Sequence, residues 1–388
     1  MNINEKTATL KETNEQLDIK AAVLNGAHQK LEVSDFKLDH PKENEALIKI
    51  VASGVCHSDA TAIDRTIPIK LPAILGHEGS GIIQEVGPGV QNFKKGDHVV
   101  IGFASCGECK YCRAGLPGAC VRFAELNNLG RMKDYTTRIH TRDGQDVSVF
   151  FGQSSLSTYS VANINNLVKV SDDVDLRYLG PLGCGFMTGS GTVLNALDPE
   201  AGSNLAVFGT GAVGLAGLMA GVIANCKHVI AVDIINSRLK LAKSLGATDT
   251  INSKNVDPVK QIQKITNGNG INYALDTTGI PPVIKSALHS LAIKGQLAPV
   301  AVSPKELTFS PLADLALPSR ELKGVIEGDA IPQDFIPTLV DFYQRGLFPI
   351  DKLTKFYSLN QVNQAFADSK NGKTVKPIIV IDKDYQPN

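Results

Sequence analysis

The fold of the chain is decided by the stretch NLAVFGTGAVG, residues 204–214. A short apolar run typical of a buried strand leads into a glycine-rich turn, and a helix rich in small residues, LAGLMAGVIA, follows. A second strand, 228–232, ends at Asp233. Strand and helix patterns continue to alternate through 271–279 and 296–303. This alternation predicts an α/β domain with a doubly wound parallel sheet.

The glycine-rich turn predicts a dinucleotide site. Gly209 permits the tight turn, Gly211 lets the backbone approach a pyrophosphate, and Gly214 lets the helix pack closely on the strand. The N–H groups at the helix start would stabilise the phosphates. Asp233 is placed to bind the ribose hydroxyls and would repel a 2′-phosphate, so NAD is favoured over NADP. Arg238 either flanks the ribose or is a solvated charge on the helix. The alternative interpretation of the whole motif is a glycine-rich turn that binds no nucleotide.

The composition fits a folded chain of two domains. Its 388 residues exceed the usual length of one domain. Hydrophobic residues make up 43% of the chain and charged residues 20%, which excludes a mostly disordered protein. The 39 Lys and Arg balance the 39 Asp and Glu, and this balance argues against a nucleic-acid binder.

The sequence indicates no membrane partner. No apolar run approaches the roughly 20 residues that span a bilayer, and the N-terminus lacks the apolar segment of a secretion signal. We therefore expect a cytoplasmic protein, with residues 1–18 as a flexible N-terminal extension.

Strand patterns also precede and follow the dinucleotide motif. Apolar or alternating runs predict strands within 19–34, 45–54, 81–86 and 98–102. The run 377–382 predicts a last strand that pairs back with the first domain. Residues 121–150 are expected to form a surface loop and hairpin.

Four of the seven cysteines predict a structural metal site. The spacing is Cys106-x-x-Cys109-x-x-Cys112-x7-Cys120, and thiolates this close on one loop can converge on a tetrahedral zinc ion with no open position. Four reduced cysteines in a turn, or an iron–sulfur cluster, are the alternatives.

Two further cysteines suggest a second metal site. Cys56 lies in GVCHSD and Cys184 in GPLGCG, and His77 of GHEG lies between them. A Cys₂His set is associated with catalytic zinc that keeps one position open. Spacing alone does not show that these three residues meet, and His77 is otherwise a hydrogen-bonded core histidine.

The motifs together resemble the zinc-dependent medium-chain alcohol dehydrogenases. GVCHSD, GHEGSG, the four-cysteine loop, GCGFMTG and GTGAVG occur in that family's order. Residues 151–155, 180–189 and 191–197 most resemble the bacterial aryl-alcohol (benzyl alcohol) dehydrogenases. The resemblance implies a β-rich GroES-like catalytic domain made from 19–186 and 328–388, and a Rossmann domain at 187–327. It also implies a homodimer or homotetramer.

The resemblance also assigns the residues around the catalytic zinc. Cys56, His77 and Cys184 match the ligands, and Glu78 matches a carboxylate beside the metal. Asp59 matches an acid that orients the liganding histidine, and Ser58 matches a hydroxyl that binds the substrate oxygen. Outside the resemblance, Glu78 is a candidate buried ion-pair partner, and Asp59 or Ser58 a candidate helix cap.

Further residues match cofactor contacts. His57 and Lys376 fall where basic residues meet the pyrophosphate, although Lys376 is equally readable as a solvated charge, and Thr188 and Val213 match positions lining the nicotinamide. One departure is Thr61, which stands where several members have a histidine that ends a proton relay. A threonine hydroxyl is no base near pH 7, so the proton must leave by another route, with His57 as a candidate participant.

The implied activity is reversible oxidation of a primary alcohol of benzyl type to the aldehyde. Hydride would pass from a zinc-bound alkoxide to NAD⁺, with two zinc ions per chain. Terpenoid alcohols of geraniol type or aliphatic alcohols are the alternative substrates. A zinc-free reductase on the same fold and a purely structural zinc protein are the rival classes.

Overall fold

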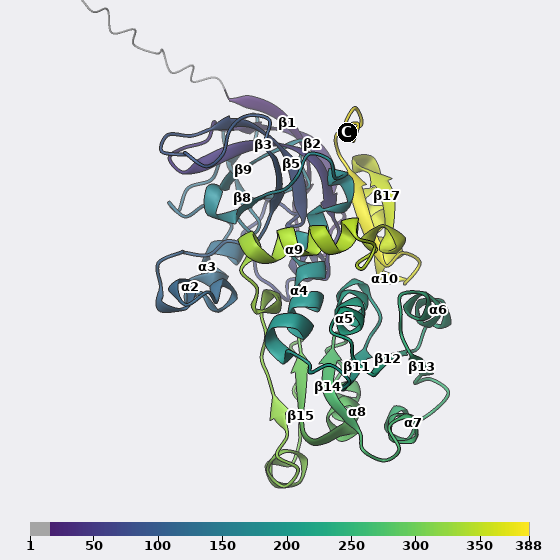
Figure 1. The fold of residues 1–388 in the computed structure, drawn as a ribbon. Coiled ribbons are helices and arrows are strands. Elements are labelled where there is room, and N and C mark those ends of the chain that lie inside the picture. The colour runs from purple at the N-terminus through teal and green to yellow at the C-terminus, as the bar shows by residue number, and fades with distance from the viewer. Residues whose placement is uncertain (1–15, 388) are drawn as a thin grey trace, which may run out of the picture.

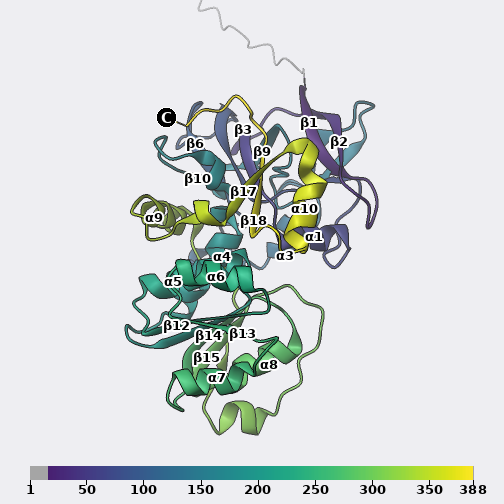
Figure 2. The ribbon, with the colours of Figure 1, turned by 90° about the vertical axis from the view of Figure 1, so that its right-hand side faces the viewer.

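The computed structural model describes residues 16–387 and divides into two bodies. One is rich in β-structure and contains both described chain ends, and the other is an α/β body formed by the middle of the chain (Figures 1 and 2). Residues 1–15 of the expected extension 1–18 lie outside the described residues, whereas Leu17 and Asp18 belong to the first strand. No helix among residues 16–387 is long and apolar enough to cross a bilayer.

The α/β body is built on a six-stranded parallel sheet in the order β13-β12-β11-β14-β15-β16. This order, with the first strand central, is that of a doubly wound dinucleotide fold. The strands are β11 (Asn204–Phe208), β12 (His228–Asp233), β13 (Asp249–Asn252), β14 (Ile271–Asp276), β15 (Leu291–Pro299) and β16 (Glu321–Leu322). The helices are α5 (Ala212–Ile223), α6 (Asn236–Ser244), α7 (Pro258–Ile265) and α8 (Pro281–Ser290). The predicted Rossmann-type sheet is confirmed.

The β-rich body combines a closed barrel with a seven-stranded sheet. The barrel strands are β1 (Leu17–Leu24), β2 (Glu32–Leu38), β4 (Ala73–Ile74), β7 (Ile139–His140) and β8 (Asp146–Val149). The sheet strands are β3 (Glu45–Gly54), β5 (Gly79–Val86), β6 (His98–Ile101), β9 (Tyr159–Asn163), β10 (Leu167–Lys169), β17 (Thr354–Ser358) and β18 (Lys376–Val380). Short helices of this body are α1 (His57–Ile63), α2 (Lys110–Arg113), α3 (Phe123–Asn128) and α10 (Val362–Lys370).

The last strand returns to the first domain as the sequence predicts. β18 pairs antiparallel with β3, with Ile378 opposite Gly54 and Val380 opposite Ala52. The apolar run of this strand is buried on the sheet, which explains why the two distant ends of the chain form one body.

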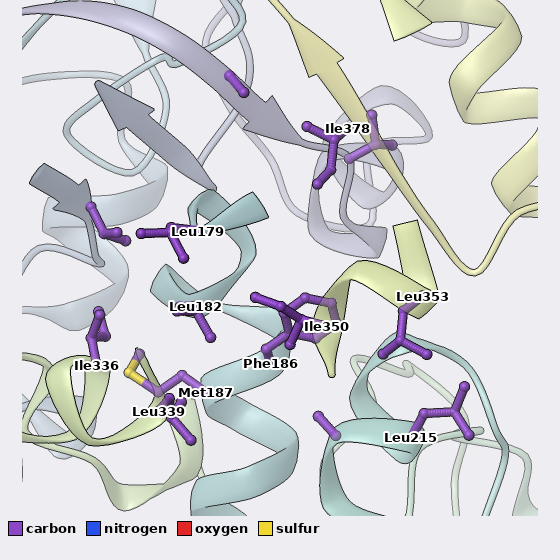
Figure 3. Packing of buried hydrophobic residues seen from close by; sticks show 14 of the residues in the cluster. Leu179, Leu182, Phe186, Met187, Leu215, Ile336, Leu339, Ile350, Leu353 and Ile378 are labelled. Atoms are coloured by element: carbon purple, nitrogen blue, oxygen red, sulfur yellow. The ribbon is translucent and has the colours of Figure 1, made fainter. Parts of the chain in front are cut away.

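Two helices connect the bodies: α4 (Gly185–Gly191) and α9 (Pro332–Gln344). Figure 3 shows Phe186 and Met187 of α4 among apolar side chains of α9 and β18, with Leu215 of α5 nearby. All these side chains belong to one buried cluster that runs through both bodies. The metal-site region of the β-rich body is therefore packed against the sheet body through α4.

Two sequence expectations differ from the structure. The run 19–34 is two strands, β1 and β2, because a turn around Gly26 separates them. Residues 121–150 are more than a surface loop and hairpin: β7 and β8 close the barrel, and Met132, Arg138 and Phe150 are buried. Their apolar partners come from distant strands, so no local pattern marks them as core.

A buried ion pair holds this region to the barrel. The Arg138 guanidinium donates from Nε to Glu45 Oε2 at 2.9 Å and from Nη2 to Glu45 Oε1 at 2.7 Å. Nη2 also donates to Asp134 at 3.0 Å. Arg138 is 1% exposed and Glu45 is 5% exposed, so removing either partner leaves a buried charge without compensation.

We predict that Arg138→Met destabilises the protein by about 3 kcal/mol, because Glu45 then loses its buried partner. The shift in the urea or thermal unfolding midpoint measures it. The control Lys42→Met removes an exposed contact to Asp134 and should change stability by less than about 0.5 kcal/mol. Equal destabilisation by the two variants would contradict the conclusion that the buried Arg138–Glu45 pair stabilises the fold.

Candidate active site and metal centres

The four-cysteine loop has the geometry of a metal site. The ligand atoms of Cys106, Cys109, Cys112 and Cys120 all lie within 4.8 Å of one another. Cys112 Sγ lies 3.9 Å from Cys106 Sγ and 3.6 Å from Cys109 Sγ. A tetrahedron of sulfur atoms at about 2.3 Å from zinc has edges of about 3.8 Å, so these distances fit a zinc ion.

Backbone N–H groups support thiolates in this loop. The N–H groups of Cys106 and Arg122 point to Cys120 Sγ at 3.3 and 3.4 Å, and the Cys109 N–H points to Cys106 Sγ at 3.3 Å. Backbone N–H groups of Cys112 and Val121 lower the pKa of Cys109 to about 6. None of the seven cysteines forms a disulfide, so the sulfurs are available as ligands.

The second predicted ligand set also converges. One ligand atom each of Cys56, His77, Glu78 and Cys184 lies within 4.8 Å of the other three. Cys56 is the N-cap of α1, His77 and Glu78 directly precede β5, and Cys184 directly precedes α4. The fold thus joins three segments that sequence spacing alone could not bring together.

His77 is prepared to bind a metal. The residue is 1% exposed, and neither ring nitrogen makes a hydrogen bond within residues 16–387. Nδ1 lies 3.2 Å from Asp59 Oδ1, an ion-pair contact without hydrogen-bond direction. Nε2 is buried without a partner among these residues. In the neutral tautomer with the proton on Nδ1, its lone pair would be available to a zinc ion.

Cys56 is the N-cap of α1, so the N-cap alternative for Asp59 is wrong, and Asp59 is the third residue of the helix. Its carboxylate accepts the Cys56 N–H at 3.1 Å, as the third residue of a capping box at the start of α1. It also accepts the Gly76 N–H at 2.9 Å and faces the His77 ring. Ser58 is likewise inside α1 and does not cap it.

Lys376 is buried in an ion pair beside the second ligand set. The residue is 2% exposed, and its Nζ donates to Glu78 Oε1 at 2.9 Å and Oε2 at 2.8 Å. Burial alone would lower the pKa of Lys376, but the Glu78 carboxylate beside it raises the pKa overall. The solvated-charge alternative is wrong, because the buried Glu78 charge requires a buried cation, and the phosphate contact stays a prediction.

Sequence reasoning missed one acid in this site, Glu327. It is 8% exposed, and burial raises its pKa to about 7. Its Oε1 lies 3.7 Å from Cys184 Sγ, and its Oε2 accepts a hydrogen bond from Thr188 Oγ1 at 3.2 Å. The only local signal was an acid before glycine in VIEGD, 325–329, which is not specific.

The residues of α1 lie at the edge of this site. Ser58 is half-buried, with Oγ 4.0 Å from Cys56 Sγ, and His57 is exposed at the start of the helix. Thr61 is buried and its hydroxyl donates to Ser58 O at 2.8 Å. That hydroxyl is therefore used by the helix backbone.

The dinucleotide motif has the expected strand–turn–helix geometry. Gly209 has a φ of 89°, and a Cβ on Gly214 would lie 1.9 Å from Gly209 O, so both positions require glycine. Gly211 has nothing within 4 Å of its Cβ position, which leaves its backbone open to a ligand. The turn is directly followed by α5.

Asp233 lies at the end of β12 as predicted. Oδ2 accepts from the Thr210 N–H and hydroxyl, both at 2.7 Å, and Oδ1 accepts from the N–H groups of Ile234 and Ile235. Arg238, one turn into α6, has a buried Nε without a hydrogen-bond partner in the described chain.

The nicotinamide-lining candidates lie on two touching helices. Thr188 is on α4 and Val213 on α5, and a Cβ on Gly189 would lie 2.0 Å from Val213 O. Thr188 Oγ1 donates to Glu327, whose other carboxylate oxygen lies 3.7 Å from Cys184 Sγ of the second ligand set, so the helix pair borders that set.

Known proteins match this arrangement along most of the chain. Residues 42–172 match the family model of the alcohol dehydrogenase GroES-like domain, and residues 212–345 match that of the zinc-binding dehydrogenases. The chain is 38% identical over 373 residues to geraniol dehydrogenase of Castellaniella defragrans, which covers 96% of this chain and 100% of the relative.

Two crystal structures are similar in fold and sequence. An alcohol dehydrogenase zinc-binding domain protein from Burkholderia ambifaria has a TM-score of 0.92 and 42% identity, over 95% of this chain and 100% of the other. Benzyl alcohol dehydrogenase from Acinetobacter calcoaceticus has a TM-score of 0.91 and 43% identity, over 94% and 99%. With two metal-ligand clusters and a dinucleotide turn in place, the chain belongs to the zinc-dependent medium-chain alcohol dehydrogenases, whose cofactors are NAD and zinc.

Proposed function

We propose that the chain oxidises a primary aromatic alcohol of benzyl type to the aldehyde, reversibly, with NAD⁺ as hydride acceptor. The supporting observation is a group of phenylalanines around His77. The ring centroids of Phe150 and Phe151 lie 5.4 and 4.6 Å from that of His77. Phe123 lies 6.4 Å from Phe151 and 5.5 Å from Phe103, which extends the aromatic group.

Phe151 is held in an unusual backbone conformation. Its φ is 51°, in the left-handed region that a bulky side chain rarely adopts. Such strain is found where the surroundings fix a side chain for function. Aromatic rings pack favourably against one another, so this group of phenylalanines favours a substrate with an aromatic ring beside its carbinol carbon.

The alternative substrates are terpenoid alcohols of geraniol type or aliphatic alcohols. The geraniol dehydrogenase above is the specific observation that favours them. A long branched alkene also packs on aromatic side chains. Comparative kinetics must therefore distinguish aromatic from terpenoid alcohols as substrates.

The proposed ligands of the catalytic zinc are Cys56, His77 and Cys184, and those of the structural zinc are Cys106, Cys109, Cys112 and Cys120. When bound, zinc polarises the alcohol oxygen and NAD⁺ accepts the hydride. Asp59 orients the His77 ring, and Glu78 sets the charge beside the metal.

Ser58 binds the alcohol hydroxyl and passes its proton outward. Because the Thr61 hydroxyl is used by the helix backbone, the next acceptor is water or the exposed His57. His57 also neighbours the cofactor pyrophosphate in this proposal.

The cofactor lies across the dinucleotide turn. Thr188 and Val213 line the nicotinamide, and Gly209, Gly211 and Gly214 admit the pyrophosphate. Asp233 and Arg238 flank the adenosine ribose. We also propose that the catalytic domain comprises 19–186 and 328–388, that 187–327 form the NAD domain, and that the protein acts in the cytoplasm.

We further propose that two copies associate through the free edge of β16. Ile293 and Leu317 are 77% and 74% exposed, and the Lys294 N–H to Pro318 O bond holds their two segments together. Leu312, in the adjoining turn 311–316, is 63% exposed. Figures 1 and 2 show this turn at the far end of the α/β body. Exposed apolar side chains beside an unpaired strand edge favour a homodimer, or a homotetramer of such pairs.

The first prediction concerns metal content. The wild-type chain should bind about two zinc ions, and Cys112→Ser and Cys184→Ala about one each, measured by plasma mass spectrometry. Cys184→Ala should also abolish turnover while leaving NADH binding nearly intact. Cys226→Ser is the control, because that sulfur contacts Ser203 Oγ at 3.7 Å, belongs to neither ligand set and should leave both ions in place. One zinc or none in the wild type would favour the rival classes.

The second prediction concerns substrate. With zinc-replete enzyme, kcat/KM for benzyl alcohol should exceed that for geraniol and for ethanol. Phe151→Leu should lower the benzyl alcohol value about fivefold, because an aromatic contact contributes about 1 kcal/mol, and should change the ethanol value little. Phe356→Leu, at the partly exposed β17, is the matched control. A preference for geraniol would keep the enzyme class and overturn the aromatic assignment.

The third prediction concerns assembly. Leu317→Asp should shift the protein toward monomer in light scattering, because a buried carboxylate opposes association. Leu129→Asp, at a similarly exposed site on the β-rich body, should leave the mass unchanged. A wild-type monomer would refute the proposed interface.

A further inference from the structure

Glu327 is a buried carboxylate at the active site with too few donors. Its Oε2 accepts one hydrogen bond, from Thr188 Oγ1 at 3.2 Å. Its Oε1 lies 3.7 Å from Cys184 Sγ, which is a weak donor as a thiol and no donor as a ligand thiolate. No ion pair to Glu327 occurs within 16–387. A carboxylate has about four acceptor sites, so most of this capacity is unused.

The backbone directs this carboxylate into the site. Glu327, Gly328 and Asp329 have φ values of 53°, 71° and 48°, so three consecutive residues adopt the left-handed conformation. For a residue with a side chain this conformation costs about 1 kcal/mol or more. The cost persists only because the surrounding structure holds the turn in place.

This turn is held in place by contacts with α4 and with the residues that directly follow α4. A Cβ on Gly328 would lie 2.6 Å from Met187 O, and a Cβ on Gly191 would lie 2.6 Å from Gly328 O, so the two backbones touch. Asn195 Nδ2 also donates to Gly328 O at 3.2 Å. Since Met187 is packed against α9 (Figure 3), the turn and the helix form one rigid support.

This position is unassigned in the proposed function but borders the proposed nicotinamide neighbour Thr188. A buried carboxylate with few hydrogen-bond donors around it favours a ligand group that donates an N–H hydrogen bond to it. The carboxamide of the nicotinamide is the N–H-bearing group of that ring. We infer that Glu327 is a cofactor-binding residue whose carboxylate accepts a hydrogen bond from the nicotinamide carboxamide N–H and so fixes the rotation of the ring. The inference rests on the proposed placement of the nicotinamide beside Thr188 and Val213.

An NAD analogue isolates this hydrogen bond. In the 3-acetylpyridine analogue a methyl ketone replaces the carboxamide, so the carbonyl is kept and the N–H donors are lost. We would measure Kd for NADH and for the reduced analogue by calorimetry on zinc-replete wild type, Glu327→Met and Glu327→Gln, with zinc content checked for each. The chain has no tryptophan, so calorimetry replaces quenching of protein fluorescence.

The wild type should bind NADH about tenfold more tightly than the analogue, the range expected for a hydrogen bond to a charged group. Glu327→Met should weaken NADH binding about tenfold and leave the analogue unchanged. Glu327→Gln should keep part of the difference, because its amide oxygen still accepts. Asp329→Asn, the other acid of the same turn, should behave as wild type.

Two results would overturn the inference: no change in NADH affinity in Glu327→Met, or equal weakening of NADH and the analogue. Val213→Phe separates this failure from that of the placement. If it weakens both ligands while Glu327→Met does not discriminate between them, only the role of Glu327 is refuted. If Val213→Phe changes neither Kd, the placement and the role of Glu327 are both refuted.

Discussion

The arrangement of the active site depends on the buried ion pair between Glu78 and Lys376, which lie 298 positions apart in the sequence. Lys376 Nζ also donates to Val55 O, and Glu78 Oε1 also accepts the Gly185 N–H. Val55, Glu78 and Gly185 are each adjacent in sequence to a proposed zinc ligand. These ligands are Cys56, His77 and Cys184, respectively. One charged contact, carried by the last strand, therefore fixes the backbone beside all three ligands. This explains why the C-terminal segment belongs to the catalytic body.

Negative charge outweighs positive charge around these ligands. Glu78, Glu327 and Asp59 are buried acids, and Lys376 is the buried lysine beside them. Two cysteines that ligate as thiolates add further negative charge. Buried charges without compensation are strongly unfavourable, so the site is electrostatically complete only with a divalent cation. The donor set, with two sulfurs and one imidazole, selects zinc over magnesium or calcium. Protein stability and metal binding are consequently linked in this chain.

Features that depend on neighbouring residues could be predicted from the sequence. The turn GTGAVG and the four-cysteine loop place their functional atoms within a few positions, so motif spacing was sufficient. Lys376 and Glu327 depend on contacts across the fold. The first is turned inward by β18 pairing with β3, and the second is placed by backbone contact between Gly328 and Gly191. Residues 121–150 likewise fill a barrel whose other strands are distant in sequence.

Substrate choice is harder to infer than chemistry for an energetic reason. Hydride transfer needs zinc ligands and a cofactor turn, and the loss of one ligand removes the reaction. Discrimination between a benzyl and a terpenoid alcohol rests on packing differences of about 1 to 3 kcal/mol. Under the proposed function, a rotated Phe151 ring or a shifted Phe123 would be enough to change this discrimination. Those rings come from a segment that shares no motif with the ligands, so specificity can change in evolution while the metal site and its ion pair stay intact.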